Sequence, residues 1–338
     1  MKIAVFETDE WECKSFEPLR DGYEVVFISG PLTAESAREC PDAEVVSTFI
    51  YSDINRSVLE FFSGLRLFAT RSTDFEHIDT GYCSELGIAV CNVPNYGEHT
   101  VAEHVFGLLL TISHRLREAL DRTRRGDFSM AGLQGFDLRG RTLGVVGTGI
   151  IGLAVIEIAR GFGMRVIAYD VMSDSEAAVR LGFDYASQEG LLKESDVVTL
   201  HVPGGAKITH LLSTQEFGQM KKGEILIDTS RGDVVDVEAL LHALADGQLS
   251  AAGLDVLPEE PAIREEAEQL RSFFHKEHNL ETILADHVLL RLRNVYITPH
   301  SEFNTREAVQ RILDTTIANI RSFAEGKPQN VLLPGWRK

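Results

Sequence analysis

Three polar side chains that could bind an anion and move a proton follow three apolar runs of the sequence. Arg231 follows "EILIDTS", Glu260 follows "AAGLDVLPE" and His300 follows "NVYITP". A guanidinium holds a carboxylate through two parallel hydrogen bonds and polarises a neighbouring carbonyl group. An imidazole exchanges a proton near neutral pH, and an adjacent carboxylate orients its ring and favours its protonated form. These residue types are therefore suited to acid–base chemistry on a carboxylate-bearing molecule.

Each of the three residues also has a simpler explanation. Arg231 could be a surface arginine in a loop, Glu260 part of an acidic turn, and His300 the polar end of a strand. Their joint placement favours the functional interpretation, because ligands of an open parallel sheet bind at the carboxyl ends of its strands. We therefore expect the three side chains to converge at one sheet edge.

A glycine motif indicates a dinucleotide site. "TLGVVGTGIIG" places Gly147, Gly149 and Gly152 in GxGxxG spacing, between a β-branched run and the helical pattern "LAVIEIARGFG". Glycines in this context allow backbone N–H groups at a helix N-terminus to approach a pyrophosphate, whereas the alternative is three glycines in a plain tight turn. The next apolar run ends at Asp170. A carboxylate there binds the ribose hydroxyls of NAD and repels the extra phosphate of NADP, so we expect NAD.

Strand-length apolar runs alternate with helical patterns along the chain, which is typical of parallel sheets joined by crossover helices. The first series is "KIAVF", "EVVFIS", "AEVVSTFI", "LRLFATRS" and "IAVCNVP". The second is "TLGVVG", "RVIAYD", "DVVTLHVP", "EILIDTS", "AAGLDVL" and "NVYITPH". Since 338 residues exceed one ordinary core, the two series predict two domains.

Two helical patterns flank the second series. The stretch 100–125 has apolar residues at helical spacing and should connect the domains; they are Val101, Val105, Leu108, Leu109 and Ile112. The stretch 304–326 predicts a C-terminal helix with Asn304 as N-cap and Glu307 three residues later. Because no strand of its own follows, we expect this helix to pack on the first domain.

Composition excludes several classes of partner. A formal charge of −18 disfavours nucleic acid and anionic membranes, which need clustered Lys and Arg. No run approaches the roughly 20 apolar residues of a membrane span, and the start "MKIAVFETDEWE" does not resemble a signal peptide. We therefore expect a cytoplasmic protein.

Cysteine and histidine spacing predicts no disulfide framework and no metal site. The four cysteines are scattered without a CxxC pair, which fits reduced thiols. His275 and His278 form an HxxH spacing with His287 nearby, but the segment is acidic and has no HExxH order.

Six stretches together resemble one protein family. They are "RSTDFEHID", "NVPNYGEHTVAEH", "GRTLGVVGTGIIG", "TSRG", "GLDVLPEEP" and "ITPHSEFNT". Over essentially its full length the chain is similar to the NAD-dependent D-isomer-specific 2-hydroxyacid dehydrogenases. The long stretch between Glu260 and His300, with Phe303 three residues after the histidine, most resembles the D-lactate dehydrogenase subgroup.

The resemblance implies an α/β protein with two doubly wound parallel-sheet domains. A smaller flavodoxin-like catalytic domain would comprise residues 1–99 and 302–338, and a Rossmann NAD-binding domain residues 100–301. In the family the site lies in the cleft between the domains. The resemblance also implies a homodimer.

The resemblance assigns roles to individual residues. Arg231 would bind the substrate carboxylate, His300 would transfer the proton, and Glu260 would orient the histidine. Backbone N–H groups of Ser72 and Thr73 would help to seat the carboxylate. Phe303 would pack on the substrate methyl, as in relatives that use pyruvate. An apolar wall for the substrate would be completed by Phe49, Tyr51 and Tyr96, although they are equally good core residues. The expected cofactor-binding residues are Gly147, Gly149, Ile150, Ile151, Asp170, His201, Val202, Pro203, Thr229, Asp255 and Val101, with Asp255 on the nicotinamide carboxamide.

The expected function is interconversion of a 2-keto acid and a D-2-hydroxy acid with NAD. The substrate pair that we expect is pyruvate and D-lactate. The alternatives are a larger 2-keto acid (phenylpyruvate, 2-ketoisocaproate or hydroxypyruvate) and a non-enzymatic NAD-sensing protein on the same fold. Departures from the family pattern bear on this choice. Asp74 replaces a glycine, Glu302 a small residue beside His300, and Ile150 a basic residue, while Gly204 and Gly205 replace a segment that often contains Leu and Thr. Extra carboxylates near an anionic substrate would weaken its binding unless they point away.

Overall fold

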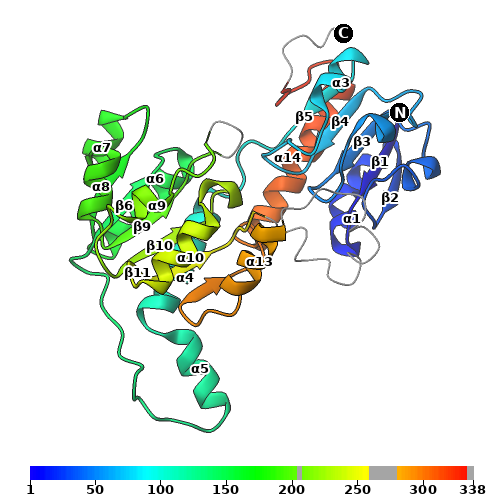
Figure 1. The fold of residues 1–338 in the computed structure, drawn as a ribbon. Coiled ribbons are helices and arrows are strands. Elements are labelled where there is room, and N and C mark those ends of the chain that lie inside the picture. The colour runs from blue at the N-terminus through cyan, green and yellow to red at the C-terminus, as the bar shows by residue number, and fades with distance from the viewer. Residues whose placement is uncertain (204–207, 259–279, 333–338) are drawn as a thin grey trace. The chain divides into compact units, whose positions relative to one another are not determined.

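The chain forms two compact units. The computed structural model describes residues 1–203, 208–258 and 280–332, so Glu260, His275 and His278 lie outside the described residues. Unit 1 comprises Met1–Tyr96 and Asn304–Lys338, and unit 2 comprises Gly97–Phe303. Each unit is built on its own parallel sheet with helices packed on it (Figure 1). The expected α/β class with two parallel-sheet domains is confirmed.

Unit 1 contains a five-stranded sheet in the order β2-β1-β3-β4-β5, and all its strand pairs are parallel. The strands are β1 (Lys2–Phe6), β2 (Glu24–Ile28), β3 (Val45–Thr48), β4 (Leu67–Thr70) and β5 (Ala89–Cys91). Every residue of β3, β4 and β5 is buried, as expected for strands covered on both faces. The first series of apolar runs therefore forms this sheet.

The helices of unit 1 include one from the far end of the sequence. They are α1 (Glu10–Phe16), α2 (Arg56–Leu59), α3 (Thr80–Glu85) and α14 (Arg306–Ala324), with 3-10 turns at Glu17–Leu19 and Ser36–Glu39. Helix α14 packs against α1 and β4, and the buried Asn319 amide donates to the Asn92 carbonyl at 2.9 Å. The N-cap of α14 is Thr305, whose hydroxyl accepts from Ala308 N, and the prediction of Asn304 was one residue early.

Unit 2 contains a seven-stranded sheet in the order β12-β11-β10-β9-β6-β7-β8, again with all pairs parallel. The strands are β6 (Thr142–Val146), β7 (Arg165–Tyr169), β8 (Asp184–Tyr185), β9 (Val197–Leu200), β10 (Glu224–Asp228), β11 (Leu249–Leu254) and β12 (Val295–Ile297). The second series of runs forms all of these except β8. Two residues are too short for a recognisable apolar run, so the sequence did not reveal β8.

The helices of unit 2 cover this sheet. They are α4 (Glu98–Ser113), α5 (Leu116–Arg124), α6 (Ile150–Gly161), α7 (Ser175–Leu181), α8 (Gln188–Glu194), α9 (Thr214–Phe217), α10 (Val237–Ala245) and α13 (Leu280–Leu289), with a 3-10 turn at Gly232–Val234. The apolar positions predicted for α4 are buried. A Cβ on Gly253 of β11 would lie 3.2 Å from Leu108 of α4, so the glycine permits close packing of helix on strand.

The single helix expected over residues 100–125 is in fact two helices. Helix α4 ends at Ser113, and Arg115 adopts a left-handed conformation with φ 50° before α5 begins. A left-handed residue cannot continue a right-handed helix, and an arginine at that point gives no sequence signal for a break. The expectation of one continuous helix was therefore wrong.

Candidate active site

The strand register of unit 2 aligns the carboxyl ends of six strands. Cross-strand partners in one row are Tyr169, Val146, Leu200, Asp228, Leu254 and Ile297, from β7, β6, β9, β10, β11 and β12. The residues that follow these strand ends are Asp170, Gly147, His201, Thr229, Asp255 and Thr298. The chain crosses from one side of β6 to the other between β8 and β9, which makes the β6–β9 boundary a topological switch point. Ligands bind at this point in open α/β sheets.

The glycines after β6 are required by close backbone approaches. Gly147 has φ +94°, and a Cβ there would lie 2.4 Å from the carbonyl oxygen of His201. A Cβ on Gly152 would lie 2.0 Å from the carbonyl oxygen of Gly147. Gly149 is the N-cap of α6, and a Cβ there would meet nothing within 4 Å. The loop backbone is thus closely packed at Gly147 and Gly152, whereas the space at the N-terminus of α6 is open. The N–H groups and the helix dipole at that N-terminus attract an anion.

Asp170 lies directly after β7 and is bonded to the glycine loop. Its Oδ2 accepts from Thr148 N at 2.6 Å and from Thr148 Oγ1 at 3.0 Å, and its Oδ1 accepts from Met172 N at 2.9 Å. Partial burial alone would raise the pKa of Asp170, but these donors lower it below its ordinary value. Asp170 is therefore an anion held beside the loop.

The glycine after Arg231 has a structural cause. A Cβ on Gly232 would lie 2.3 Å from the backbone carbonyl carbon of Leu257, so only glycine allows these two loops to pass. The loop places a half-buried arginine just beyond the end of β10. Burial lowers the pKa of Arg231, and the nearby Asp233 opposes that change.

Asp228, the last residue of β10, is a buried acid that the sequence analysis missed. It is 2% exposed, and its Oδ1 accepts from Ser230 N at 2.9 Å and from Ser230 Oγ at 2.6 Å. Burial raises the pKa of Asp228 to about 7, although the Ser230 donors lower it. An aspartate at the end of an apolar run was visible in the sequence, but its burial depends on the neighbouring strands.

Asp255 supports the loop that contains His300. It is fully buried, and its carboxylate accepts from Ser301 N at 3.1 Å, from Glu302 N at 2.9 Å and from the Thr298 hydroxyl. His104 of α4 lies against the same group, with Nε2 3.3 Å from Oδ1. One carboxylate thereby fixes the chain on both sides of His300.

His300 itself has a strained backbone conformation. Its φ is +51°, a region that residues other than glycine seldom adopt and that occurs preferentially at functional sites. Its Nε2 lies 3.6 Å from Oε1 of Glu302. Glu260, the expected orienting residue, lies outside the described part of the chain.

In unit 1, Ser72 and Thr73 follow the carboxyl end of β4. The Ser72 hydroxyl donates to the Asp74 carbonyl at 2.5 Å, and the Thr73 hydroxyl donates to the Val93 carbonyl at 2.9 Å. Asn92 holds the same loop by donating to the Thr73 carbonyl at 2.7 Å. Among the residues that the structure describes, the backbone N–H groups of Ser72 and Thr73 have no acceptor. Both N–H groups remain available to an anion.

The expected pocket aromatics are partly exposed. Phe49 and Tyr51 follow β3 and pack edge to face with ring centroids 5.6 Å apart. Tyr51 is 56% exposed, so it is not a core residue. Burial raises the pKa of the Tyr96 phenol, while a hydrogen bond with Thr73 lowers it. Phe303, in unit 2, is half-buried.

The remaining expected cofactor residues lie at the same edge of unit 2 or beside it. Ile150 and Ile151 begin α6, and Ile150 is 57% exposed. His201 donates or accepts in a 3.0 Å bond with Thr199 Oγ1, and loss of hydration lowers its pKa to about 3, so it is neutral. The other positions are Val202 and Pro203 after β9, Thr229 after β10 and Val101 in α4.

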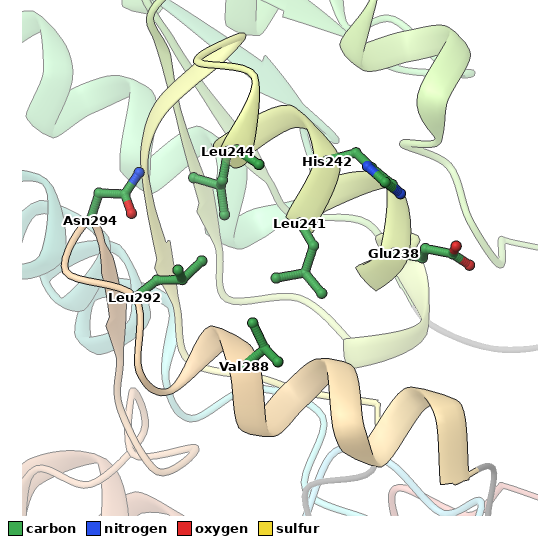
Figure 2. A pocket seen from close by; sticks show the side chains of 8 residues that line it. Glu238, Leu241, His242, Leu244, Val288, Leu292 and Asn294 are labelled. Carbon is green, nitrogen blue, oxygen red and sulfur yellow. The ribbon is translucent and has the colours of Figure 1, made fainter.

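A separate apolar cavity of about 320 Å³ lies between α10 and α13 (Figure 2). Leu241, Leu244, Val288 and Leu292 supply its apolar wall, and Asn294, directly before β12, marks it as close to the amino edge of the sheet. It contains none of the expected site residues and is not part of the candidate active site.

The residues at the carboxyl edge fit a dinucleotide. The glycine loop leaves open space at the N-terminus of α6 for a pyrophosphate, and Asp170 supplies acceptors for a ribose.

No helix among the described residues is long and apolar enough to cross a membrane.

Comparison with known proteins defines the family. Residues 106–301 match the family model for the D-isomer specific 2-hydroxyacid dehydrogenase, NAD binding domain. The chain is 36% identical to the D-lactate dehydrogenase of Escherichia coli K12, over 97% of this chain and 98% of the relative. It also superimposes on the pyruvate reductase of Chlamydomonas reinhardtii with a TM-score of 0.88 and 32% identity, covering 97% of both chains. A D-lactate dehydrogenase from Aquifex aeolicus, solved with NAD and lactic acid, gives a TM-score of 0.82 and 32% identity, covering 96% of both chains.

The parallel sheet with its glycine loop, together with the matched NAD-binding family model, identifies an NAD-dependent oxidoreductase. The chain belongs to the D-isomer-specific 2-hydroxyacid dehydrogenase family. It interconverts 2-keto acids and D-2-hydroxy acids with NAD as cofactor.

Proposed function

We propose that the protein reduces pyruvate to D-lactate with NADH. The supporting observation is the alignment of strand ends in unit 2, which brings the glycine loop, Asp170 and the segments bearing Arg231 and His300 to one sheet edge. The names of the relatives, two D-lactate dehydrogenases and a pyruvate reductase, support this substrate pair.

In this proposal each residue has one task. Arg231 holds the substrate carboxylate through two hydrogen bonds, assisted by the N–H groups of Ser72 and Thr73. His300, in its protonated form, donates a proton to the keto oxygen during reduction and recovers it during oxidation. Glu260 retains the orienting role implied by the family. NADH, when bound, supplies the hydride that the keto carbon accepts.

The cofactor contacts extend the same proposal. The N–H groups at Gly149, Ile150 and Ile151 bind the pyrophosphate, and Asp170 binds the ribose. The nicotinamide end of the cofactor is contacted by Asp255, by Val101 and by the loops after β9 and β10. The residues of these two loops that take part are His201, Val202, Pro203 and Thr229. Since both Asp255 oxygens already accept hydrogen bonds from the His300 loop, a carboxamide would share an acceptor there.

Substrate size depends on the aromatic residues Phe49, Tyr96 and Phe303. We propose that they restrict the substituent at the keto carbon to a methyl group. The alternative is a larger 2-keto acid such as phenylpyruvate, 2-ketoisocaproate or hydroxypyruvate. The exposed ring of Tyr51 would favour one of these larger substrates only if the ring moved to contact the larger substituent.

The decisive experiment is a substrate panel. NADH oxidation is followed by absorbance with pyruvate and the three larger keto acids, and kcat/KM is compared. We expect pyruvate to be highest. A higher value for any larger acid would reassign the substrate, and NADH binding without turnover of any acid would support the NAD-sensing alternative. Chiral analysis of the product checks the D configuration.

We further propose a homodimer formed through α5 and the chain that follows it. Figure 1 shows this segment projecting from the seven-stranded sheet, and it exposes Leu120 by 57%, Phe128 by 80% and Met130 by 84%. Exposed apolar side chains grouped in this way are typical of interaction surfaces. Light scattering should give twice the monomer mass of 37.5 kDa, and replacement of Phe128 and Met130 by Glu should halve the measured mass.

A cytoplasmic location also stays a proposal, supported by four free cysteines of which three are buried.

A further inference from the structure

Glu302 is a buried acid beside the imidazole of His300. Its side chain is 9% exposed, and its Oε1 lies 3.6 Å from His300 Nε2. Its second oxygen, Oε2, is buried and has no hydrogen-bond partner among the described residues. Ionised carboxylates are seldom buried unless a cation or donors compensate the lost hydration. Among the described residues, His300 lies near enough to provide that compensation when it is protonated.

The position of Glu302 is fixed by its backbone as well as by burial. Glu302 N donates to Asp255 Oδ2 at 2.9 Å, and Ser301 N donates to Asp255 Oδ1 at 3.1 Å. The loop therefore cannot carry the backbone of Glu302 away from His300 without breaking hydrogen bonds to a fully buried carboxylate. The short distance to the imidazole is a property of the fold of this loop.

The other charged groups around this loop determine how strongly Glu302 acts. Asp255 lies beneath the loop and is opposed by His104, whose Nε2 is 3.3 Å from Oδ1 and 3.0 Å from the Thr298 hydroxyl. Arg231 follows the neighbouring strand β10, and Glu260 lies outside the described residues. Asp255 already accepts several hydrogen bonds, whereas Glu302 Oε2 has none among the described residues, so of these two carboxylates Glu302 is better able to respond to the proton on His300.

We propose that Glu302 is a positioning residue that acts through His300, holding the imidazole and stabilising its protonated form. This inference rests on the proposed role of His300 as the proton donor. A carboxylate within about 4–6 Å favours the charged state of a neighbouring cation. Because reduction needs the protonated imidazole, Glu302 extends keto-acid reduction to more alkaline pH.

The same carboxylate has an opposite effect on substrate binding. An anionic keto acid beside His300 is repelled by the Glu302 carboxylate. At acid pH an imidazole is protonated with or without a neighbouring carboxylate, so this repulsion is the effect of Glu302 that remains there. Removal of the charge should therefore help binding at acid pH and harm proton donation at alkaline pH. Opposite effects at the two ends of the pH range distinguish this role from a structural one, which would lower activity at every pH.

The test compares pH profiles of kcat/KM for pyruvate reduction in the full-length protein. Glu302→Gln keeps the shape of the side chain and removes its charge, and Glu302→Ala removes both. Both variants should equal or exceed the unmodified protein at pH 6, by up to about threefold, and fall to about one tenth of it at pH 9, so that the profiles cross. Glu307→Gln, which removes an exposed carboxylate nearby in the sequence, is the matched control and should leave the profile unchanged.

Two further measurements separate the possible failures. NADH affinity and the unfolding temperature should be unaffected by Glu302→Gln, which excludes misfolding. If the unmodified protein is active and His300→Gln is inactive but the Glu302 profiles superimpose on the unmodified one, the role of Glu302 is refuted while the proposed function stands. If His300→Gln retains activity, the proton donor itself is misassigned, and the proposed roles of His300 and Glu302 both fail although the protein still reduces pyruvate. A uniform loss at every pH would reduce Glu302 to a structural residue.

Discussion

The two edges of the seven-stranded sheet use polar residues differently. At the amino edge, polar side chains bond to one another and to nearby backbone: Asp196 accepts from Thr142 N at 2.8 Å, and Lys221 donates to Asp196 at 3.0 Å and to the Glu194 carbonyl at 2.6 Å. At the carboxyl edge, the backbone is forced into uncommon conformations at Gly147 and His300. Glycine adopts positive φ without strain, whereas at His300 the strain costs about 1–3 kcal/mol, and strain of this kind clusters at functional sites.

The difference shows which polar groups stabilise the fold and which remain for ligands. Amino-edge groups such as Gln248, which donates to the Met220 carbonyl at 2.7 Å, satisfy partners within the protein. Carboxyl-edge groups leave the N-terminus of α6 open and hold Asp170 beside it as an anion. Substitutions at the carboxyl edge should therefore change catalysis or cofactor choice, whereas those at the amino edge should change stability.

The largest effect is expected from His300→Gln. Loss of the proton donor should lower kcat for pyruvate reduction by about 10²–10⁴-fold, with NADH affinity nearly unchanged. Stopped-flow absorbance and NADH fluorescence titration measure the two quantities. His99→Gln, an exposed histidine on α4, is the control. If His300→Gln retains most of its activity, another residue donates the proton, and the catalytic role that distinguishes the carboxyl edge from the amino edge would lose its main support.

Glu224→Gln tests the amino edge. Glu224 begins β10, is 2% exposed, and has one buried carboxylate oxygen without a partner among the described residues. Burial raises its pKa to about 8, although Lys221 N and the Lys221 charge lower it. Because this value exceeds the unfolded one of about 4.3, the folded state binds the proton more tightly, and its stability falls as pH rises from about 4 to about 8.

The neutral glutamine should remove that loss. We expect Glu224→Gln to raise the free energy of unfolding by roughly 1–3 kcal/mol at pH 9 and to change it little at pH 4. Denaturant unfolding at both pH values gives the comparison, with the exposed Glu238→Gln as control. An equal effect at the two pH values would mean that Glu224 is ionised throughout. Activity at pH 7 should not change.

The sequence predicted the strands of both sheets well, because long β-branched runs are unambiguous when they alternate with helical patterns. It could not predict the break at Arg115 or the two-residue β8, which depend on tertiary packing and not on local preference. It also placed Arg231 and His300 after strands but gave no strand order. Only the register shows that their strand ends share one row, and the bonds of Asp255 join residues more than 40 positions apart.

Sequence reasoning also missed the buried charges. Arg71 is 1% exposed and donates to the carbonyls of Phe6 at 2.9 Å and Glu7 at 2.6 Å, across the sheet of unit 1. Asp228 is equally hidden at the end of β10. A charged residue gives no local sign of burial, since burial depends on strands brought beside it by the fold. The departures at Asp74 and Glu302 were visible because they replace residue types that the family pattern leads one to expect.

A smaller effect is expected at Asp170, which should set the preference for NADH over NADPH. Asp170→Asn keeps one acceptor oxygen, for either Thr148 or Met172, and removes the charge that repels a 2′-phosphate. The ratio of kcat/KM for the two cofactors should fall by about tenfold. Asp184→Asn, on the exposed edge strand β8, is the control. Equal use of both cofactors by the unmodified protein would refute the role at once.

The smallest effect is expected at Asp74, which tests whether the carboxyl edge of unit 1 also serves an anion. The Asp74 carbonyl accepts from the Ser72 hydroxyl at 2.5 Å, a bond that glycine preserves because it uses only the backbone. If the Asp74 carboxylate lies about 6 Å from the substrate carboxylate, the two repel by roughly 3 kcal/mol at an effective dielectric of about 20, before screening by salt and nearby cations. Screening leaves a modest remainder, so Asp74→Gly should lower KM for pyruvate several fold at low ionic strength and less at high ionic strength. Asp74→Asn, which removes the charge but keeps a side chain, should reproduce most of the change. A KM that is the same at every ionic strength in all three proteins would mean that Asp74 points away from the substrate, and the polar groups of this edge would then resemble those of the amino edge of unit 2.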